Sequence, residues 1–265
     1  MRTLPALVLV VASAASAIAA GRQAIDISRY TIVDLSHAYG PSTVMWPTSP
    51  TKFELNQLSF GMTEGGYFYA ANSLATPEHG GTHLDAPIHF SQTGRTAEQI
   101  PLEQLIAPAV VIDVTTRALA DRNYRATRDD VLQFERMHGT ITRGTIVLLR
   151  TGWSRHWPNA KAYLGDDTPG DASKLSFPSF GVDAVRLLVE ERAVAALGVD
   201  TASIDYGKST DFQVHRLAAS KNVPGLENLT NLDQLPPRGA LVIALPMKIE
   251  GGSGGPLRAV ALVAK

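Results

Sequence analysis

The sequence lacks cysteine, an excess of either charge, internal repeats and a low-complexity linker. Without cysteine the chain cannot form disulfides, so a substantial hydrophobic core must hold it together, and any metal site must be built from His, Asp and Glu. Lys and Arg number 24 against 25 Asp and Glu, which gives neither a basic stripe for nucleic acid nor an acidic tail. The chain of 265 residues, 45% of them hydrophobic, therefore fits one globular domain with no nucleic-acid partner.

The first residues differ in composition from the rest. Arg2 supplies one positive charge, a run rich in Leu, Val and Ala extends over residues 4–20, and Ala17-Ile18-Ala19 has small residues at the spacing that signal peptidase cuts. A buried helix and a membrane anchor are the alternatives, but the run is short for a full span and ends without a charge cluster. We predict a signal peptide over residues 1–19 and a single domain over residues 20–265. The domain is expected to be exported to the periplasm or secreted, without membrane attachment after cleavage.

Short apolar runs rich in β-branched or aromatic residues predict strands. These runs lie at residues 30–35, 52–58, 67–74, 110–114, 145–149, 193–199, 241–245 and 260–263. Two segments predict helices, one over residues 127–137 with Thr127 as its N-cap and one over residues 182–191 that starts near Ser179. Many strands and few helices indicate an α/β or α+β fold.

Three of the seven histidines fall within eleven residues, in the string HGGTHLDAPIHF at residues 79–90. Its glycines and proline disfavour a helix, so we expect a glycine turn followed by an extended segment. Residues two apart in an extended segment point the same way, so His83 and Asp85 face one point, and the turn lets His79 fold back to meet them. Two imidazoles and a carboxylate suit zinc, manganese or ferrous iron, and three ligands leave a position for water.

His89 lies four residues beyond Asp85, on the same face of the expected extended segment. A single histidine beside apolar residues is usually structural. Here it belongs to a cluster, and an imidazole exchanges protons near neutral pH. His89 is therefore a candidate general acid or base rather than a ligand.

The string HGGTHLDAPIHF is similar to the HxGTHxDxPxH signature of the metal-dependent cyclase family, which includes bacterial arylformamidases (kynurenine formamidases) and isatin hydrolases. DLS at residues 34–36 resembles the first strand of that family, and GVDTAS at residues 198–203 resembles its GxDTxS turn. The resemblance covers most of the chain beyond the signal peptide. It implies a swivelling β/β/α fold with a β-barrel-like core and flanking helices, and assembly as a homodimer or homotetramer.

The same resemblance implies a second metal ion. Arylformamidases of this type use a further histidine and a glutamate twelve residues later, and His215 and Glu227 have that spacing. By this carry-over His79, His83 and Asp85 bind the first ion, and Asp85, His215 and Glu227 the second. The predicted cofactor is Zn or Mn, one or two ions per chain. Without the family, His215 would pass for a solvated helix residue and Glu227 for a helix cap or surface charge.

One set of aromatic residues is a candidate for substrate contact, whereas one glycine-rich segment is not expected to bind a ligand. Trp46 and Tyr69 belong to a set of aromatic residues upstream of the metal motif. Such residues are more often core, but exposed beside a site they would suit a flat aromatic substrate. The glycine-rich residues 251–255 lack the Lys-Ser/Thr of a phosphate-binding loop, so we expect a flexible turn there.

The metal motif predicts a metal ion with a bound water, and the resemblance implies that this water hydrolyses an amide bond in a small molecule. The substrate would be an arylformamide, or a cyclic amide such as isatin. Two alternatives stay open: a lyase, cyclase or lactone hydrolase on the same site, and an exported metal-binding protein without turnover.

Overall fold

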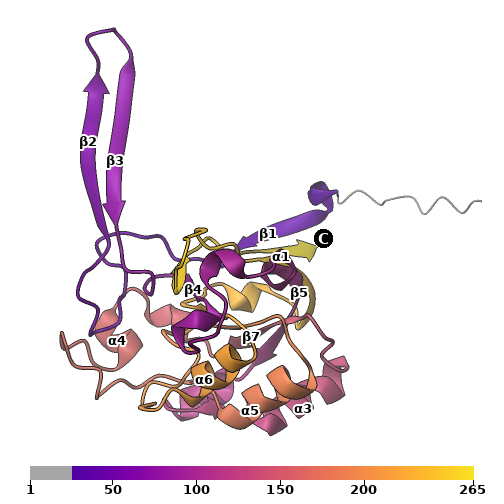
Figure 1. The fold of residues 1–265 in the computed structure, drawn as a ribbon. Helices are drawn as coiled ribbons and strands as arrows, with labels where there is room; N and C mark the ends of the chain where they lie inside the picture. The colour runs from indigo at the N-terminus through magenta and orange to yellow at the C-terminus, as the bar shows by residue number, and fades with distance from the viewer. Residues whose placement is uncertain (1–25) are drawn as a thin grey trace, which may run out of the picture.

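The computed structural model describes residues 26–265, and one mixed sheet runs through this part of the chain (Figure 1). The predicted signal peptide lies outside the described residues. Across residues 26–265, every helix is too short or too polar to cross a membrane.

The sheet has nine strands, and its centre is parallel while its outer strands are antiparallel. In spatial order the strands are β1 (Tyr30–Asp34), β13 (Val260–Ala264), β11 (Arg238–Ile243), β5 (Ile106–Asp113), β7 (Ile146–Arg150), β9 (Ala196–Val199), β10 (Gly225–Glu227), β4 (His83–Asp85) and β12 (Gly254–Pro256). At each edge of the sheet, a strand from early in the chain therefore pairs with one from late in the chain, β1 with β13 and β4 with β12.

The two faces of the sheet bury separate hydrophobic cores, as β7 illustrates. Its side chains alternate, so Ile146 and Leu148 enter one core while Val147 and Leu149 enter the other. The run is apolar throughout because a central parallel strand is buried on both faces. This explains why a short apolar run was enough to predict the strand.

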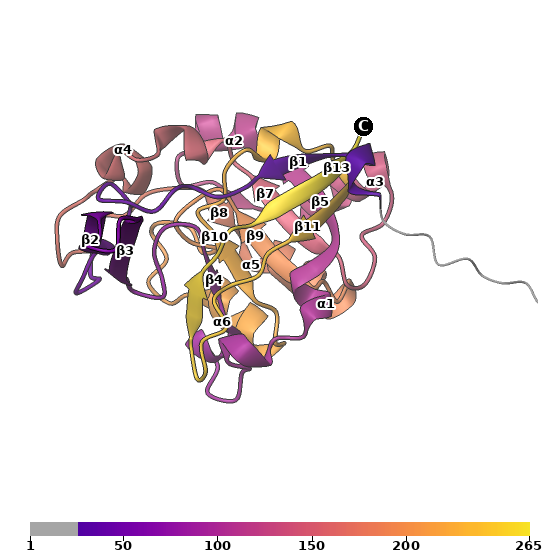
Figure 2. The same ribbon diagram turned by 90° about the horizontal axis from the view of Figure 1, so that it is seen from above.

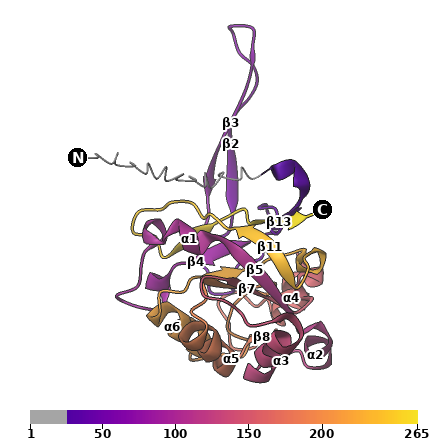
Figure 3. The same cartoon turned by 90° about the vertical axis from the view of Figure 1, so that its right-hand side faces the viewer.

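The helices are not confined to one face of the sheet, because Leu105 enters one core while Val131, Val185 and Val214 enter the other. They are α1 (Leu102–Leu105), α2 (Thr115–Ala120), α3 (Arg128–His138), α4 (Ala160–Leu164), α5 (Val182–Arg186) and α6 (Gln213–Ser220). Of these, α3, α5 and α6 form the layer below the sheet in Figure 3. Thr127 caps α3 as predicted, because its hydroxyl accepts from the Asp130 amide while the Asp130 carboxylate accepts from the Thr127 amide.

A long hairpin projects from the opposite side of the molecule (Figures 1 and 3). It consists of β2 (Glu54–Met62) and β3 (Phe68–Ala75), which pair antiparallel and are exposed along most of their length. Figure 2 shows it nearly end-on beside the sheet. A further small ladder joins β6 (Arg125–Ala126) and β8 (Ser179–Phe180).

The structure corrects three local predictions. The second predicted helix covers residues 182–191 as expected, but Gly181 rather than Ser179 caps its start, and its second half, Leu187–Glu191, is π-helical. The extended segment expected to reach His89 ends at Asp85, because Pro87 starts a 3₁₀ turn, Pro87–His89. The glycine-rich residues expected to form a flexible turn instead supply β12, in which Gly254 and Gly255 pair with β4.

Candidate metal site

Strand β4 forms the middle of the site, because it is hydrogen-bonded on both sides. On one side β10 places Glu227 directly opposite His83. On the other side β12 places Gly254 opposite Asp85. His83, Asp85 and Glu227 are all buried, with 3–5% of their surface exposed.

The predicted glycine turn before β4 is confirmed, and the surroundings explain why it needs glycine. Gly81 has a φ of +61°, and a Cβ there would lie 2.6 Å from the Tyr39 ring. A Cβ on Gly80 would lie 2.0 Å from the sulfur of Met45. The turn brings His79 back onto the end of β4, where its Nδ1 lies 2.6 Å from Asp85 Oδ1.

Helix α6 brings His215 to the same point. Its Nε2 lies 3.0 Å from Asp85 Oδ2 and 3.1 Å from Glu227 Oε1. The other ring nitrogen, Nδ1, is 2.7 Å from Asp205 Oδ2, and Asp205 also accepts from the backbone amides of Val214 and His215 at the start of α6. Asp205, which no sequence pattern indicated, therefore fixes both the helix and the imidazole.

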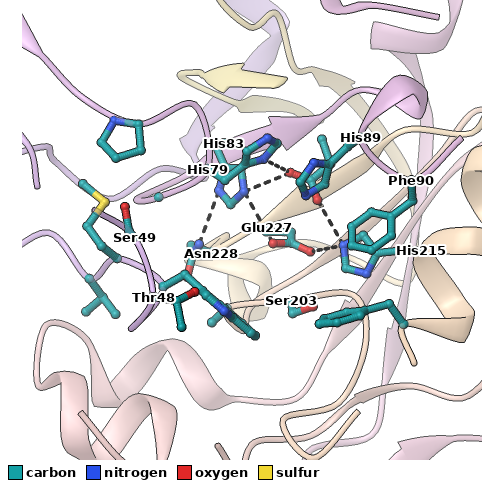
Figure 4. Close-up of a pocket in the computed structure, with 18 of the residues that line it drawn as sticks. Thr48, Ser49, His79, His83, His89, Phe90, Ser203, His215, Glu227 and Asn228 are labelled. Carbon is teal, nitrogen blue, oxygen red and sulfur yellow. Dashed lines mark hydrogen bonds and ion pairs between the residues drawn. The ribbon is translucent and has the colours of Figure 1, made fainter. Parts of the chain in front are cut away.

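His83 is held in the same manner. Its Nδ1 donates to the carbonyl of Gly81 at 3.0 Å, so its Nε2 faces Asp85 Oδ1 at 3.1 Å and Glu227 Oε2 at 3.5 Å. The buried Asn228 side chain donates to the same Gly81 carbonyl and accepts from the Tyr163 hydroxyl. Figure 4 shows His83, Glu227 and His215 pointing toward one another. Each of these histidines thus presents one nitrogen to a common centre while the other is tied elsewhere.

The charges of the cluster are strongly interdependent. Burial disfavours the charged Asp85, but His79, His215 and His83 outweigh it and hold the pKa of Asp85 well below its usual range. Burial also disfavours a charged His83, yet Asp85 and Glu227 raise the pKa of His83 to about 9. The pKa of His215 is raised well above its usual value, because hydrogen bonds to Asp205, Asp85 and Glu227 outweigh burial.

These shifts and distances fit a divalent cation. Buried carboxylates need positive charge beside them, which protonated imidazoles or a bound metal ion can supply. Imidazole nitrogens and carboxylate oxygens are ligands that zinc and manganese accept. Two sets of donor atoms lie close enough to share an ion: His79, Asp85 and His89, and His83, Asp85 and Glu227.

The structure brings together all five residues predicted as ligands: His79 and His83 face Asp85 Oδ1, and His215 faces Asp85 Oδ2 and Glu227 Oε1. The two sets of donor atoms additionally place His83 with Glu227 and His89 with His79. Asp85 belongs to both sets, with Oδ1 facing His79 and His83 and Oδ2 facing His215. This is the arrangement expected of a carboxylate that can bridge two ions.

His89 lies at the edge of the cluster. Its ring stacks on His79 with centroids 3.9 Å apart. Part of the ring faces solvent, yet burial of the remainder lowers the pKa of His89 to about 4. The Pro87–His89 turn, rather than an extended strand, gives it this position.

The cluster forms the floor of a pocket of about 380 Å³. Most of its lining is apolar, including Val44, Met45, Trp46, Pro77, Phe90 and Phe212. Trp46 lines the pocket and stays a candidate substrate contact, and its ring forms a T-shaped pair with Phe177. Tyr69 lies on the hairpin strand β3, 51% exposed, and does not line this pocket.

Comparison with known proteins agrees with the fold. The Cyclase family profile matches residues 33–206. The isatin hydrolase of Roseibium aggregatum is 34% identical, covering 88% of this chain and 92% of its own, and the kynurenine formamidase of Salinibacter ruber is 27% identical, covering 86% and 96%.

Two solved structures are also similar. An isatin hydrolase bound to the product analogue thioisatinate has a TM-score of 0.83 at 32% identity, over 90% of this chain and 94% of that one. Isatin hydrolase A from Ralstonia solanacearum has a TM-score of 0.82 at 35% identity, over 89% and 93%.

The chain belongs to the Cyclase family. The predicted fold class and the predicted enzyme class, a hydrolase acting on an amide bond, are confirmed with it.

Proposed function

We propose that the protein hydrolyses the amide bond of a small flat aromatic molecule, either a cyclic amide such as isatin or an arylformamide. The observation that carries this proposal is the buried His/Asp/Glu cluster at the floor of an apolar pocket. An apolar wall with a few polar groups at one end orients a substrate whose reactive bond must meet that end. The relatives named for isatin and kynurenine derivatives support the same substrate class.

The pocket walls have the chemistry to hold an aromatic ring. Trp46, Phe90 and Phe212 all line the pocket, and the ring centroids of Phe90 and Phe212 are 5.3 Å apart. Phe90 also packs on His215 at 4.4 Å, so a ring seated among these side chains lies next to the cluster. Aromatic pairs at such distances favour flat ligands.

His79, His83, Asp85, His215 and Glu227 would hold one or two ions of zinc or manganese. A divalent ion bound there supplies a water of lowered pKa and polarises a carbonyl group. The chain itself then has two tasks, to keep the substrate carbonyl over the cluster and to transfer a proton to the departing nitrogen. We assign the proton transfer to His89, since it lines the pocket beside His79 without being fixed in the centre of the cluster. Its lowered pKa leaves the imidazole neutral at neutral pH, so His89 would first accept a proton from the attacking water and then pass that proton to the departing nitrogen.

A substrate panel tests the proposal. The purified protein, loaded with zinc or manganese, is assayed on isatin, on N-formylkynurenine and on a set of small lactones. Turnover on either amide supports the proposal, and preference for isatin over the formamide decides between the two amides. Turnover confined to lactones, or tight metal binding with no turnover at all, would overturn it.

We also propose that the protein assembles with a second copy of itself through the hairpin. Leu58, Phe60 and Met62 alternate along β2 and are 68–69% exposed, and Phe68, paired with Met62, extends the same stripe. An exposed apolar stripe of this length is typical of an interface. The segments that lead into and out of the hairpin also line the pocket, through residues 44–46, 48–50 and Pro77, so docking at the hairpin would affect the pocket.

Sedimentation velocity on Phe60→Asp tests this assembly. We expect this variant to sediment as a monomer. The control Ser59→Asp, on the other face of β2, should sediment like the wild type. A wild-type monomer at micromolar concentration would refute it.

We propose that residues 1–19 direct export and are then removed, because their composition is typical of a signal peptide. Expression of the full chain in a bacterium, followed by N-terminal sequencing of the periplasmic product, tests it. A product that starts near Ala20 supports cleavage, and an uncleaved cytoplasmic product contradicts it.

A further inference from the structure

The glycine-rich loop of residues 251–255 is fixed against the candidate metal site. The carbonyl of Ser253 accepts the Ala86 amide at 2.8 Å, and the carbonyl of Gly252 accepts the Ala97 amide at 2.9 Å. Gly254 then pairs with Asp85 in the sheet. The loop is therefore held by its backbone, independently of the Ser253 side chain.

The Ser253 side chain links His79, the first residue of the metal motif, to Glu78, which precedes it. Its Oγ lies 2.8 Å from His79 Nε2, and it also hydrogen-bonds Glu78 Oε2. Glu78 Oε2 accepts the Ser253 amide as well, at 3.1 Å. Glu78, Ser253 and His79 thus form a chain that ends where His79 Nδ1 meets Asp85.

The direction of this chain follows from the donors available. A carboxylate accepts hydrogen bonds only, so the single hydroxyl proton of Ser253 must go to Glu78. Ser253 Oγ is then left as the acceptor for His79, whose Nε2 must carry a hydrogen. A neutral His79 consequently has its lone pair on Nδ1, the nitrogen that faces Asp85.

Glycine at position 254 makes the contact possible. A Cβ there would lie 2.4 Å from the carbonyl oxygen of Leu84 and 2.7 Å from Cε1 of His79. The backbone of Gly254 therefore lies close to the His79 ring, and a side chain at this position would displace either β12 or the imidazole.

We propose that Ser253 and Glu78 are positioning residues for His79, which set the Nε2–H tautomer and thereby direct Nδ1 at a divalent metal. The proposal rests on the proposed function, because it takes His79 as a ligand. It gives the glycine-rich loop a role, since the loop carries Ser253 to a histidine 174 positions earlier in the sequence.

The first test is Ser253→Ala, measured by metal affinity and by NMR. In wild-type protein labelled with ¹⁵N-histidine and loaded with zinc, long-range ¹H–¹⁵N spectra should show His79 protonated at Nε2 and coordinated at Nδ1. Loss of a hydrogen bond that orients a ligand typically weakens metal affinity by about 10–100-fold. We expect Ser253→Ala to weaken metal affinity by this factor. Its far-UV circular dichroism should be unchanged, because the loop keeps its backbone hydrogen bonds.

Glu78 gives the second test, with a matched control. Glu78→Gln keeps an oxygen that accepts from Ser253, so it should retain most of the affinity, whereas Glu78→Met should lose as much as Ser253→Ala. The double variant Ser253→Ala/Glu78→Met should lose no more than either single change, because both act through one hydrogen bond. Glu98→Met is the control, since Glu98 accepts the Gly251 amide of the same loop without bonding the Ser253 hydroxyl.

The outcomes separate this inference from the proposed function. If wild-type protein binds no divalent metal, the proposed function fails. If wild type binds metal but Ser253→Ala binds equally well, or if His79 is coordinated through Nε2, the positioning role is refuted while the metal site stands. If Glu78→Gln loses as much metal affinity as Glu78→Met, Glu78 acts through its charge, and the positioning role is refuted as well.

Discussion

Asp205→Asn should destabilise the protein even with no metal present. Helix α6 starts after Phe212, whose side chain gives no cap. Asp205 supplies the cap from a distant loop: Oδ1 accepts from the Val214 amide at 3.1 Å, and Oδ2 accepts from the His215 amide at 3.0 Å. An asparagine would turn an NH₂ group toward one of these donors and would remove a negative charge from a helix N-terminus.

The magnitude follows from the hydrogen bonds that the asparagine cannot make. A missing N-cap costs about 1 kcal/mol. Hydrogen bonds to a charged group contribute about 1.5–3 kcal/mol, and here one oxygen also holds His215 Nδ1 at 2.7 Å. We expect a loss of roughly 2–4 kcal/mol in the free energy of unfolding. For a domain of this size that lowers Tm by roughly 5–15 °C.

The assay is thermal unfolding followed by circular dichroism in excess chelator, so that metal binding does not contribute. Asp183→Asn is the matched control, because Asp183 is an exposed carboxylate in the first turn of the neighbouring helix α5. It should change stability by less than about 0.5 kcal/mol. If the free energy of unfolding of Asp205→Asn differs from that of the wild type by less than about 0.5 kcal/mol, Asp205 does not cap α6.

Three more changes test separate parts of the structure. His89→Ala should lower turnover by roughly 10²–10⁴ with metal content unchanged, as measured by kinetics and elemental analysis. A metal-depleted variant would instead make His89 a ligand. Glu227→Gln should remove one ion per chain if two are bound, and an unchanged count would exclude Glu227 as a ligand. Glu135→Gln should cost about 1 kcal/mol at pH 7, because Arg192 holds the pKa of Glu135 below its usual value by a paired hydrogen bond. Because the folded pKa of Glu135 lies below the unfolded one, this stabilisation is fully present above the unfolded pKa of about 4.3. The difference in urea denaturation should therefore shrink below that pH and vanish as pH falls through the folded pKa. A constant difference down to pH 3 would argue against the pair.

The sequence predicts best where one local pattern decides the outcome. β7 could be predicted because an apolar β-branched run suits a strand buried on both faces. The turn before His83 could be predicted because two glycines and a later proline exclude a helix. For Thr127, the hydroxyl and the acid three residues later define a cap at short range.

The sequence predicts poorly where the fold joins distant segments. β10 and β12 have three residues each, and they are strands because β4 lies between them. Asp205 and Ser253 are ordinary loop residues in sequence, and their partners become apparent only in three dimensions. His215 and Glu227 needed the family resemblance, since spacing does not reveal ligands so far from residues 79–85.

The pairing of β4 with β12 also governs when the site can form. His79 and Ser253 are 174 positions apart, and His215 and Asp85 are 130 apart. Contacts of such separation form late, because long loops must close first. During synthesis β4 is made before α6, β10 and β12, so a nascent chain holds the HGGTHLD motif before its partners exist. Selection of the metal would then take place in whichever compartment the finished chain folds, and the metal supply of that compartment would determine which ion the enzyme carries.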